Sequence, residues 1–453
     1  MNAIKSYAFE KDGINQSLNF ALSPNGTFSS EKYSLLDVMA DERLKHLSLS
    51  ERMEILCSYT DDTKAGKHYS YRRELLTGCQ NKVAINEIAH GRPKELINLS
   101  SNDYLNLSQH ARVKRAVTEC VNDFGLGIGS APMLSGTSYL HKKLENKLAA
   151  LKKTEAAMLF TSGYGANIGT LKALLKENDV AICDMYAHAS LMDGCSNTNK
   201  IYFKHNDMES LESALNKAKQ YKNKLVIVDG VYSMDGDIAK LDQIVEIAHR
   251  HSAWVMVDEA HATGVLGAEG RGSAEYYGLE GKIDIISGTF SKALGAVGGF
   301  VAGNKELINY LQVACRSYMF STAPAMPVIA GVIEALNVIE DEPQLRKNLW
   351  DNIEYFRNGL IDAGFNIGES ETAIIPLIIG DDYKVKEMTH RLHLAGIFVN
   401  AVPYPAVPKK LTRVRLSLTS GHTKEQLDIA LREIIRVAKE LRIIRILEMA
   451  YAA

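Results

Sequence analysis

Residues 255–267 read VMVDEAHATGVLG, a short apolar run that ends abruptly in acidic and polar side chains. A run of this length, rich in β-branched residues, is typical of a buried strand that leads into a turn. Asp258 caps this apolar strand, so its carboxylate needs a partner there, because unpaired burial is costly. An aspartate that caps the following helix is a common alternative, but it leaves His261 unexplained.

The same texture recurs in four other apolar runs, at 156–160, 180–183, 225–228 and 283–286. Helical stretches such as 211–219 and 241–251 lie between them, and leucines spaced by four, four and three residues predict a helix that opens near Ser138. Short buried runs that alternate with amphipathic helices predict an α/β fold, a mostly parallel sheet covered by helices on both faces.

Sheets of this kind bind their ligands at the carboxyl ends of the strands. Four of the predicted strands end in reactive side chains, at 161–164, at Asp229, at 258–261 and at 287–292. Residues 288–299, GTFSKALGAVGG, place Lys292 in a glycine-rich turn, where desolvation favours a nucleophilic amine. A lone lysine in such a loop is usually a solvated charge, but the 34 positions from Asp258 to Lys292 leave room for a helix and the next strand, as a shared site at the strand ends requires.

Three parts are expected along the chain. Residues 1–95 are polar and weakly periodic, with a possible helix at 51–59, and we expect an N-terminal extension and a segment that packs on the main domain. Residues 96–330 form the predicted main domain. Residues 331–453 are expected to form a smaller C-terminal α+β domain, with strand candidates at 372–380, 394–402 and 412–419 and a long helix from Glu425.

Composition excludes several classes of partner. The 52 Lys and Arg nearly balance the 54 Asp and Glu, so no electrostatic case exists for nucleic acid or an anionic membrane. The six cysteines are scattered without a Cys-x-x-Cys pair, which argues against a zinc cage or a disulfide framework. Neither a signal peptide nor a membrane span is evident, so we expect a cytoplasmic protein without a bound metal.

The two segments DEAH at 258–261 and TFSKALG at 289–295 resemble the fold-type I pyridoxal-phosphate (PLP) enzymes, and specifically the α-oxoamine synthase family. Further segments agree, namely SSNDYLNLS at 100–108, LFTSGYGANIGTL at 159–171, HASLMDG at 188–194, VYSMDGDIAKLDQI at 231–244 and VRLSLTSGHT at 414–423. The resemblance runs from about Asn98 to the C-terminus.

This resemblance implies an activity and its substrates. It implies a fold-type I PLP-dependent transferase that condenses an amino acid with an acyl thioester, carried on coenzyme A or an acyl carrier protein. Carbon dioxide is lost and an α-amino ketone is formed, as in 8-amino-7-oxononanoate synthase or serine palmitoyltransferase. The choice among glycine, alanine and serine stays open, because the loop around Ala131, Pro132 and Met133 departs from the pattern of relatives.

Four catalytic residues follow from the resemblance. Lys292 is expected to form the Schiff base and then to remove the α-proton. Asp258 is expected to keep the pyridine nitrogen protonated, and His188 to stack on the ring, where a flat aromatic side chain fits. His261, together with Ser233, is expected to hydrogen-bond the ring oxygen.

The remaining expected contacts bind the phosphate and the substrate. Gly163 and Tyr164 open a helix whose N–H groups suit the phosphate; Thr289 and Ser291 flank the lysine. Thr322 is expected to reach the phosphate from a partner subunit, which implies a homodimer with shared active sites. Arg415 is expected to clamp the substrate carboxylate, with Arg413 as the alternative in register, and Asn102 to face the substrate.

Two alternative functions fit parts of the sequence. An aminotransferase or lyase of the same fold commonly carries a phosphate-binding arginine eight positions after the lysine, where this chain has Phe300. A binding protein that has lost catalysis is the second alternative. The joint presence of Lys292, Asp258 and His188 argues against it.

Overall fold

The computed structural model describes residues 42–65, 72–86 and 93–444. Residues 1–41, 66–71 and 87–92 of the N-terminal extension therefore lie outside the described residues, as do residues 445–453.

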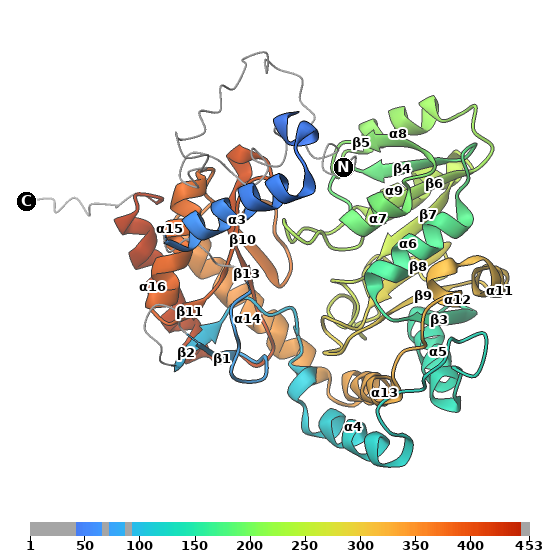
Figure 1. The fold of residues 1–453 in the computed structure, drawn as a ribbon, viewed down its shortest axis with the longest axis horizontal. Helices are drawn as coiled ribbons and strands as arrows, with labels where there is room; N and C mark the ends of the chain where they lie inside the picture. The colour runs from blue at the N-terminus through green and yellow to red at the C-terminus, as the bar shows by residue number, and fades with distance from the viewer. Residues whose placement is uncertain (1–41, 66–71, 87–92, 445–453) are drawn as a thin grey trace, which may run out of the picture.

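A seven-stranded sheet forms the centre of the larger lobe in the described chain, with strand order β3-β9-β8-β7-β6-β4-β5 (Figure 1). Five strands from β8 to β5 run parallel, whereas β9 is antiparallel to both of its neighbours. This confirms the α/β fold with a mostly parallel sheet. The strands are β3 (Ala156–Phe160), β4 (Val180–Asp184), β5 (Asn199–Phe203), β6 (Lys224–Asp229), β7 (Trp254–Asp258), β8 (Ile285–Thr289) and β9 (Gly299–Gly303).

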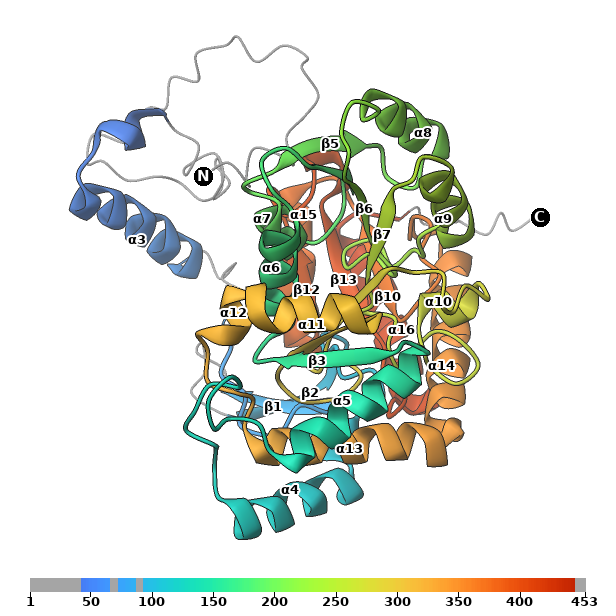
Figure 2. The ribbon, with the colours of Figure 1, turned by 90° about the vertical axis from the view of Figure 1, so that its right-hand side faces the viewer.

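Helices cover both faces of this sheet because successive strand residues point in opposite directions. Met256 and Ile227 pack with α6 (Gly163–Leu174), α7 (Ala189–Gly194) and α11 (Lys305–Ala314). Their neighbours Val257 and Val228 belong to the core on the other face, with α8 (Met208–Lys217) and α9 (Leu241–Arg250). Figure 2 shows α6 and α7 on one side of β6 and β7, and α8 and α9 on the other.

A smaller lobe is built on the antiparallel sheet β10-β13-β12 and lies beside the central sheet (Figure 1). Its strands are β10 (Ile374–Ile378), β12 (Asn400–Val402) and β13 (Arg413–Ser417). Its helices are α14 (Pro343–Asp362), α15 (Asp382–Leu394) and α16 (Lys424–Glu440). The predicted C-terminal strand candidates and the predicted long final helix all correspond to elements of this lobe.

A third sheet joins the N-terminal region to the smaller lobe. β1 (Lys82–Asn86) pairs antiparallel with β2 (Pro93–Asn98), and β2 pairs in parallel with β11 (Ile397–Phe398). The sequence predicted instead that this segment packs on the main domain and that the main domain begins at 96. A pairing partner about 300 residues away leaves no local signal, so β2 reads only as an apolar run.

Among the remaining helices of the described chain, α3 (Leu49–Ala65) lies apart from the central sheet (Figure 2), whereas the others surround the larger lobe. Helix α13 packs against α4 and α5 and is continuous across position 330, where the domain boundary was predicted. These helices are α3 (Leu49–Ala65), α4 (Ala111–Phe124), α5 (Tyr139–Lys152), α10 (Ser273–Tyr276), α12 (Arg316–Met319) and α13 (Met326–Asp341). No helix in the described ranges is long and apolar enough to cross a membrane.

Candidate active site

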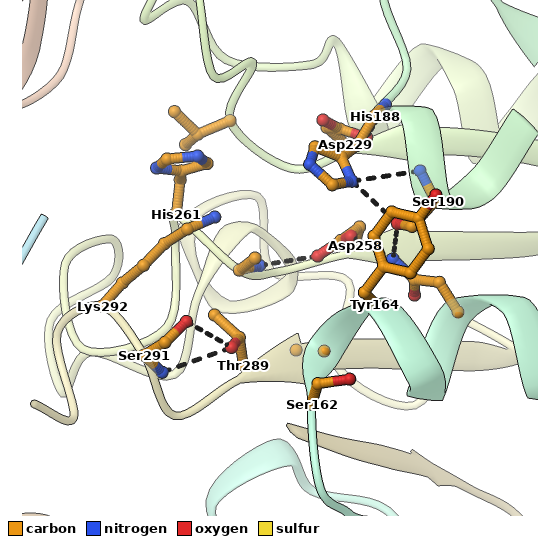
Figure 3. Close-up of a pocket in the computed structure, with 15 residues that line it drawn as sticks. Ser162, Tyr164, His188, Ser190, Asp229, Asp258, His261, Thr289, Ser291 and Lys292 are labelled. Atoms are coloured by element: carbon orange, nitrogen blue, oxygen red, sulfur yellow. Dashed lines mark hydrogen bonds between the residues drawn. The ribbon is translucent and has the colours of Figure 1, made fainter. Parts of the chain in front are cut away.

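The carboxyl ends of the central strands lie level with one another. Asp229 at the end of β6 pairs in register with Asp258 at the end of β7, which pairs with Ser287 of β8. A cavity of about 260 Å³ opens at this edge (Figure 3). Its lining includes eight predicted residues, Gly163, Tyr164, His188, Asp258, His261, Thr289, Ser291 and Lys292.

One end of the cavity is suited to an anion. The first N–H groups of α6 have no partner within the helix, and only the N–H of Gly165 is capped, by Ser162 Oγ at 2.9 Å. A Cβ added to Gly163 would lie 2.9 Å from the Thr289 Cβ, so glycine lets the helix end approach β8. The Thr289 and Ser291 hydroxyls lie 2.8 Å apart beside this helix N-terminus. Thr289 Oγ1 donates to the Gly298 carbonyl at 2.9 Å, so the Ser291 hydroxyl is the one of the pair that can turn to donate to an anion.

Lys292 reaches across the cavity from the turn after β8, toward His261 (Figure 3). Burial lowers the pKa of its amine to about 8, although the nearby Asp258 and Asp229 carboxyls act to raise it. Within the described part of the chain, its Nζ has no hydrogen-bond partner. A substantial fraction of this lysine is therefore neutral near pH 8 and free to react.

Asp258 is held rigidly on the opposite side. Its Oδ2 accepts a hydrogen bond from Asn167 Nδ2 at 2.6 Å, and its Oδ1 accepts one from the Ala260 N–H at 2.9 Å. Beside it, burial and the charge of Asp258 raise the pKa of Asp229 well above its ordinary value. The two carboxyl groups therefore differ: Asp258 is fixed by two hydrogen-bond donors, whereas Asp229 has a raised pKa.

A chain of hydrogen bonds links Asp258 to His188. Asn167 Nδ2 also donates to Ser190 Oγ at 2.8 Å, and Ser190 Oγ lies 2.7 Å from His188 Nδ1. Because the serine hydroxyl accepts from the amide, it donates its proton to Nδ1, and this network assigns the His188 proton to Nε2. Burial lowers the pKa of His188, which favours the neutral ring.

His261 is fixed in a similar way by a buried tyrosine. The Tyr104 hydroxyl lies 2.7 Å from His261 Nδ1, and burial raises the pKa of this tyrosine to about 12. Burial also lowers the pKa of His261 well below its usual value, with the cations Lys292 and Arg415 acting in the same direction. His261 is therefore a neutral imidazole at the cavity wall.

The two candidate arginines of β13 differ in their partners. Arg413 is 1% exposed and its Nη1 donates to Asp235 Oδ1 at 2.6 Å, so its charge is neutralised within the protein. Arg415 donates its Nε to the Ser233 carbonyl at 2.7 Å and its Nη2 to Asn102 Oδ1 at 3.1 Å. Arg415 and Asn102 thus lie together, which favours Arg415 over Arg413.

Four predicted contacts are absent from the lining of this cavity, namely Asn102, Ser233, Thr322 and Arg415. Ser233 is absent from the lining, and what it contributes is its carbonyl, which holds Arg415. Thr322 is exposed and does not line the cavity either. A contact from a second subunit lies outside what one chain can display, so the role of Thr322 stays a prediction.

Seven lining residues are not among the predicted site residues, and four of them carry polar side chains, namely Ser162, Asn167, Ser190 and Asp229. Asn167 carried a usable signal, since it follows Gly163 by four positions and so lies on the same face of the helix. Ser190 carried none, because its role depends on the short helix that begins after His188.

Phe300 occupies the position at which aminotransferases commonly carry a phosphate-binding arginine. It is fully buried in β9 and stacks on Phe290 with ring centroids 6.0 Å apart. This position therefore supplies no cation to bind a phosphate, which argues against the aminotransferase alternative.

The donor set fits PLP. The helix N-terminus and the Ser291 hydroxyl suit a phosphate, Asp258 suits a protonated ring nitrogen, and Lys292 suits an aldehyde carbon. Gly163 has no side chain, so the end of α6 can approach Thr289 closely and the anion end of the cavity stays open.

We expect the capture of PLP by cofactor-free protein to quicken with rising pH, with a midpoint near 8. Only the neutral amine attacks a carbonyl carbon, and burial lowers the pKa of Lys292 to about 8. Stopped-flow absorbance between pH 6.5 and 10.5 measures the midpoint, with Lys292→Ala as the unreactive control. A midpoint near the ordinary lysine value of 10.5 would contradict this assignment.

The model of the family described as aminotransferase class I and II matches residues 94–434. The chain is 47% identical over 354 residues to 8-amino-7-oxononanoate synthase of Thermoanaerobacter pseudethanolicus, covering 78% of this chain and 90% of that protein. Identity to 8-amino-7-oxononanoate synthase 1 of Bacillus subtilis is 43% over 353 residues, with the same two coverages. A solved serine palmitoyltransferase from S. paucimobilis with a bound PLP-myriocin aldimine superposes with a TM-score of 0.83 at 31% identity, covering 88% of this chain and all of that one.

Proposed function

The chain belongs to the aminotransferase class I and II family, and on that premise we propose that it joins alanine to a heptanedioyl thioester with loss of carbon dioxide. It is a PLP-dependent acyltransferase of the α-oxoamine synthase type. The observation that carries the function is the reactive, buried Lys292 amine, which faces the fixed Asp258 carboxylate at one sheet edge.

The substrates follow from the product in the relatives' name. In 8-amino-7-oxononanoate the amino carbon is bonded to a methyl group, so an amino acid with a methyl side chain, alanine, supplies both carbons and the nitrogen. The other seven carbons carry a ketone at one end and a carboxylate at the other. They correspond to a seven-carbon dicarboxylic acid activated as a thioester at one end.

The overall reaction balances on these groups. A new bond joins the α-carbon of alanine to the acyl carbonyl carbon, and the carbon–sulfur bond of the thioester breaks to release the thiol. The α-carboxylate then leaves as carbon dioxide, and a proton returns to the α-carbon. Bound PLP supplies the electron sink that makes the α-carbon nucleophilic.

The residues of this chain hold the reactants and move the protons. Lys292 would hold the cofactor by its aldehyde carbon, and its freed amine would take the α-proton. A pKa of about 8 for this amine suits an operating pH near neutrality. Asp258, fixed by Asn167, keeps a proton on the ring nitrogen. His188 would support the ring face, and His261 would face the ring oxygen with Nε2, the nitrogen that Tyr104 leaves free.

The test is substrate selection. Loaded enzyme is incubated with alanine, serine or glycine, each combined with heptanedioyl-CoA or palmitoyl-CoA, and the products are identified by mass. We expect the amino ketone from alanine and the heptanedioyl donor. A product from serine and palmitoyl-CoA alone would replace the proposal with a serine-palmitoyltransferase-like activity.

Arg415 is proposed to bind the substrate carboxylate, with Asn102 beside it. We expect Arg415→Ala to raise the KM for the amino acid by about 10- to 100-fold, the effect of losing a charge-assisted hydrogen bond. Arg357 on α14 is a matched control, because its Nε also donates to a backbone carbonyl, that of Ser370. Steady-state kinetics on Arg415→Ala and Arg357→Ala check the assignment, and an equal KM change in both variants contradicts it.

The working unit is proposed to be a homodimer in which Thr322 contacts the phosphate of the other subunit. Its hydroxyl is exposed in the single chain, as such a role requires. Light scattering that gave the mass of one chain for the loaded enzyme would rule the shared site out.

A further inference from the structure

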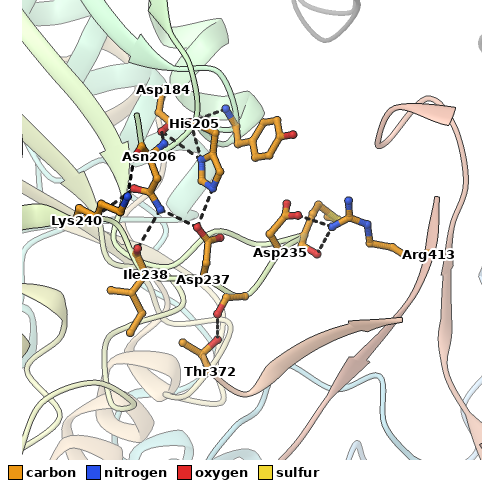
Figure 4. Close-up of polar contacts among 12 residues, drawn as sticks. Asp184, His205, Asn206, Asp235, Asp237, Ile238, Lys240, Thr372 and Arg413 are labelled. Carbon is orange, nitrogen blue, oxygen red and sulfur yellow. Dashed lines mark hydrogen bonds and ion pairs between the residues drawn. The ribbon is translucent and has the colours of Figure 1, made fainter. Parts of the chain in front are cut away.

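A hairpin over residues 231–238 connects the cavity edge to the smaller lobe. Val231 and Ile238 form an antiparallel bridge just after β6, and the Gly236 N–H donates to the Tyr232 carbonyl at 2.9 Å. The hairpin is thus a closed unit whose tip, Ser233 to Gly236, projects toward β13 (Figure 4).

Every residue of this tip contacts the smaller lobe. The Ser233 carbonyl accepts from Arg415 Nε at 2.7 Å, and the Met234 carbonyl accepts from Arg413 Nη1 at 2.9 Å. Asp235 pairs with the same guanidinium. The tip therefore orients both arginines of β13, including the one proposed to bind the substrate carboxylate.

Gly236 completes the contact at the start of β10. Its carbonyl accepts from Thr372 Oγ1 at 2.9 Å and from the Glu371 N–H at 3.1 Å. Its φ is +73°, and an added Cβ would lie 2.0 Å from the Ile374 carbonyl oxygen. A side chain has no room here, so the backbone of the hairpin packs directly against the start of β10.

His205 fastens the base of the hairpin from the larger lobe (Figure 4). Its Nε2 lies 2.7 Å from Asp237 Oδ2, and its Nδ1 lies 3.1 Å from Asp184 Oδ1 at the end of β4. Both carboxylates are buried. The ring of Tyr186 stacks on the imidazole with centroids 4.4 Å apart, a geometry that suits a cation.

Asn206 strengthens the same attachment. Its Nδ2 donates to Asp237 Oδ2 at 2.7 Å and to the Ile238 carbonyl at 3.1 Å. The Lys240 N–H donates to Asn206 Oδ1 at 3.2 Å. Two adjacent residues after β5 thus bind the second arm of the hairpin along its length.

The imidazole carries a charge at neutral pH. Burial opposes protonation, but the hydrogen bonds and charges of Asp184 and Asp237 outweigh it and raise the pKa of His205 to about 10. The other titratable groups near this cluster include Tyr186, Asp229, Tyr232, Asp235 and Arg413. Without the imidazolium, two buried carboxylates would face each other uncompensated.

We propose that His205 is a positioning residue for substrate recognition: held between Asp184 and Asp237, it fixes the 231–238 hairpin that orients the Arg415 guanidinium. The proposal rests on the proposed function of Arg415. The mechanism above assigns no role to His205, which does not line the cavity.

Amide hydrogen exchange tests the attachment without substrate or cofactor. In His205→Gln and Asp237→Asn, the amides of Gly236 and Glu371 are expected to exchange roughly tenfold faster, because the hairpin opens locally. His251→Gln is the matched control, since His251 Nε2 lies 2.7 Å from Glu212 Oε1, away from the hairpin. Unchanged exchange in both hairpin variants, or an equal change in the control, overturns the proposal.

Kinetics then separate positioning from general destabilisation. We expect His205→Gln to raise the KM for the amino acid roughly tenfold, with kcat and the KM for the acyl donor changed less than about threefold. In an Arg415→Lys background the same substitution is expected to add little, because both changes act on one guanidinium. Full additivity of the two KM effects would overturn the link to Arg415.

Alkaline pH gives an independent readout. The folded-state pKa of His205 lies above its ordinary 6.5, so its stabilising contribution is complete below that pH and is lost as the pH rises through about 10. The Tm difference between the wild type and His205→Gln is expected to shrink across this range, and a constant difference counts against the proposal. If the wild type uses serine instead of alanine, the proposed function fails. The KM for serine is then compared between the wild type and His205→Gln, so the role of His205 is tested separately.

Discussion

Lys292→Ala is expected to lower kcat for the condensation by about 10⁴-fold or more, since it removes the group proposed to hold the cofactor and to take the α-proton. Lys292→Arg is expected to be equally inactive, because a guanidinium stays protonated at all working pH values. Thiol release from the acyl donor, measured at saturating PLP, gives the rate. A normal melting temperature in both variants would show that folding is intact.

Borohydride reduction of the loaded enzyme locates the attachment directly. Peptide mapping is expected to find the pyridoxyl mass on the peptide that contains Lys292. Lys152 is an internal control, because burial also lowers the pKa of its amine. Its Nζ is already bonded to Thr263 Oγ1 at 2.8 Å and to the Arg271 carbonyl. A label on Lys152, or on any other lysine, would remove the basis of the proposed mechanism.

Four of the five parallel strands of the central sheet, β4, β6, β7 and β8, could be predicted because their buried runs are continuous and end in polar residues. The predicted strand at 156–160 coincides with β3, and Ser138 is the N-cap of α5 as expected. Strands β5 and β9 were missed. β5 is an edge strand that mixes polar and apolar residues, and β9 is short and bounded by glycines at Gly299 and Gly303.

Contacts between distant segments could not be predicted. Arg413 and Arg415 are two positions apart on one strand, so they point to the same face and their sequence context is nearly the same. Only the hairpin tip distinguishes them, by neutralising Arg413 with Asp235. Ser233 illustrates the same limit, since a serine in a motif suggests a hydroxyl contact, whereas the fold uses its carbonyl.

Asp258→Asn is expected to lower kcat by about 10²- to 10³-fold, the effect of losing an electrostatic stabiliser that acts on charge developing in the transition state. The substitution keeps the shape of the side chain and the acceptor for the Ala260 N–H. Its amide cannot hold a proton on the ring nitrogen, so the cofactor becomes a weaker electron sink. Product formation from alanine at saturating PLP measures the loss.

Cofactor capture is expected to respond in the opposite sense. The Asp258 charge raises the pKa of Lys292, so its removal lowers that pKa below about 8 and leaves more neutral amine at pH 7. Capture by Asp258→Asn should then be as fast as in the wild type or faster, while turnover falls. A variant that was merely misfolded would lose both, and the two rates measured on one preparation separate these cases.

Asp229→Asn is the matched control for this prediction. Burial and the charge of Asp258 raise the pKa of Asp229 well above its ordinary value, which favours a neutral carboxyl that asparagine imitates. Its turnover is therefore expected to fall much less than that of Asp258→Asn, although both side chains end adjacent strands in register. Equal losses in the two variants would mean that the edge of the sheet needs both carboxylates, and that Asp258 alone does not make the ring an electron sink.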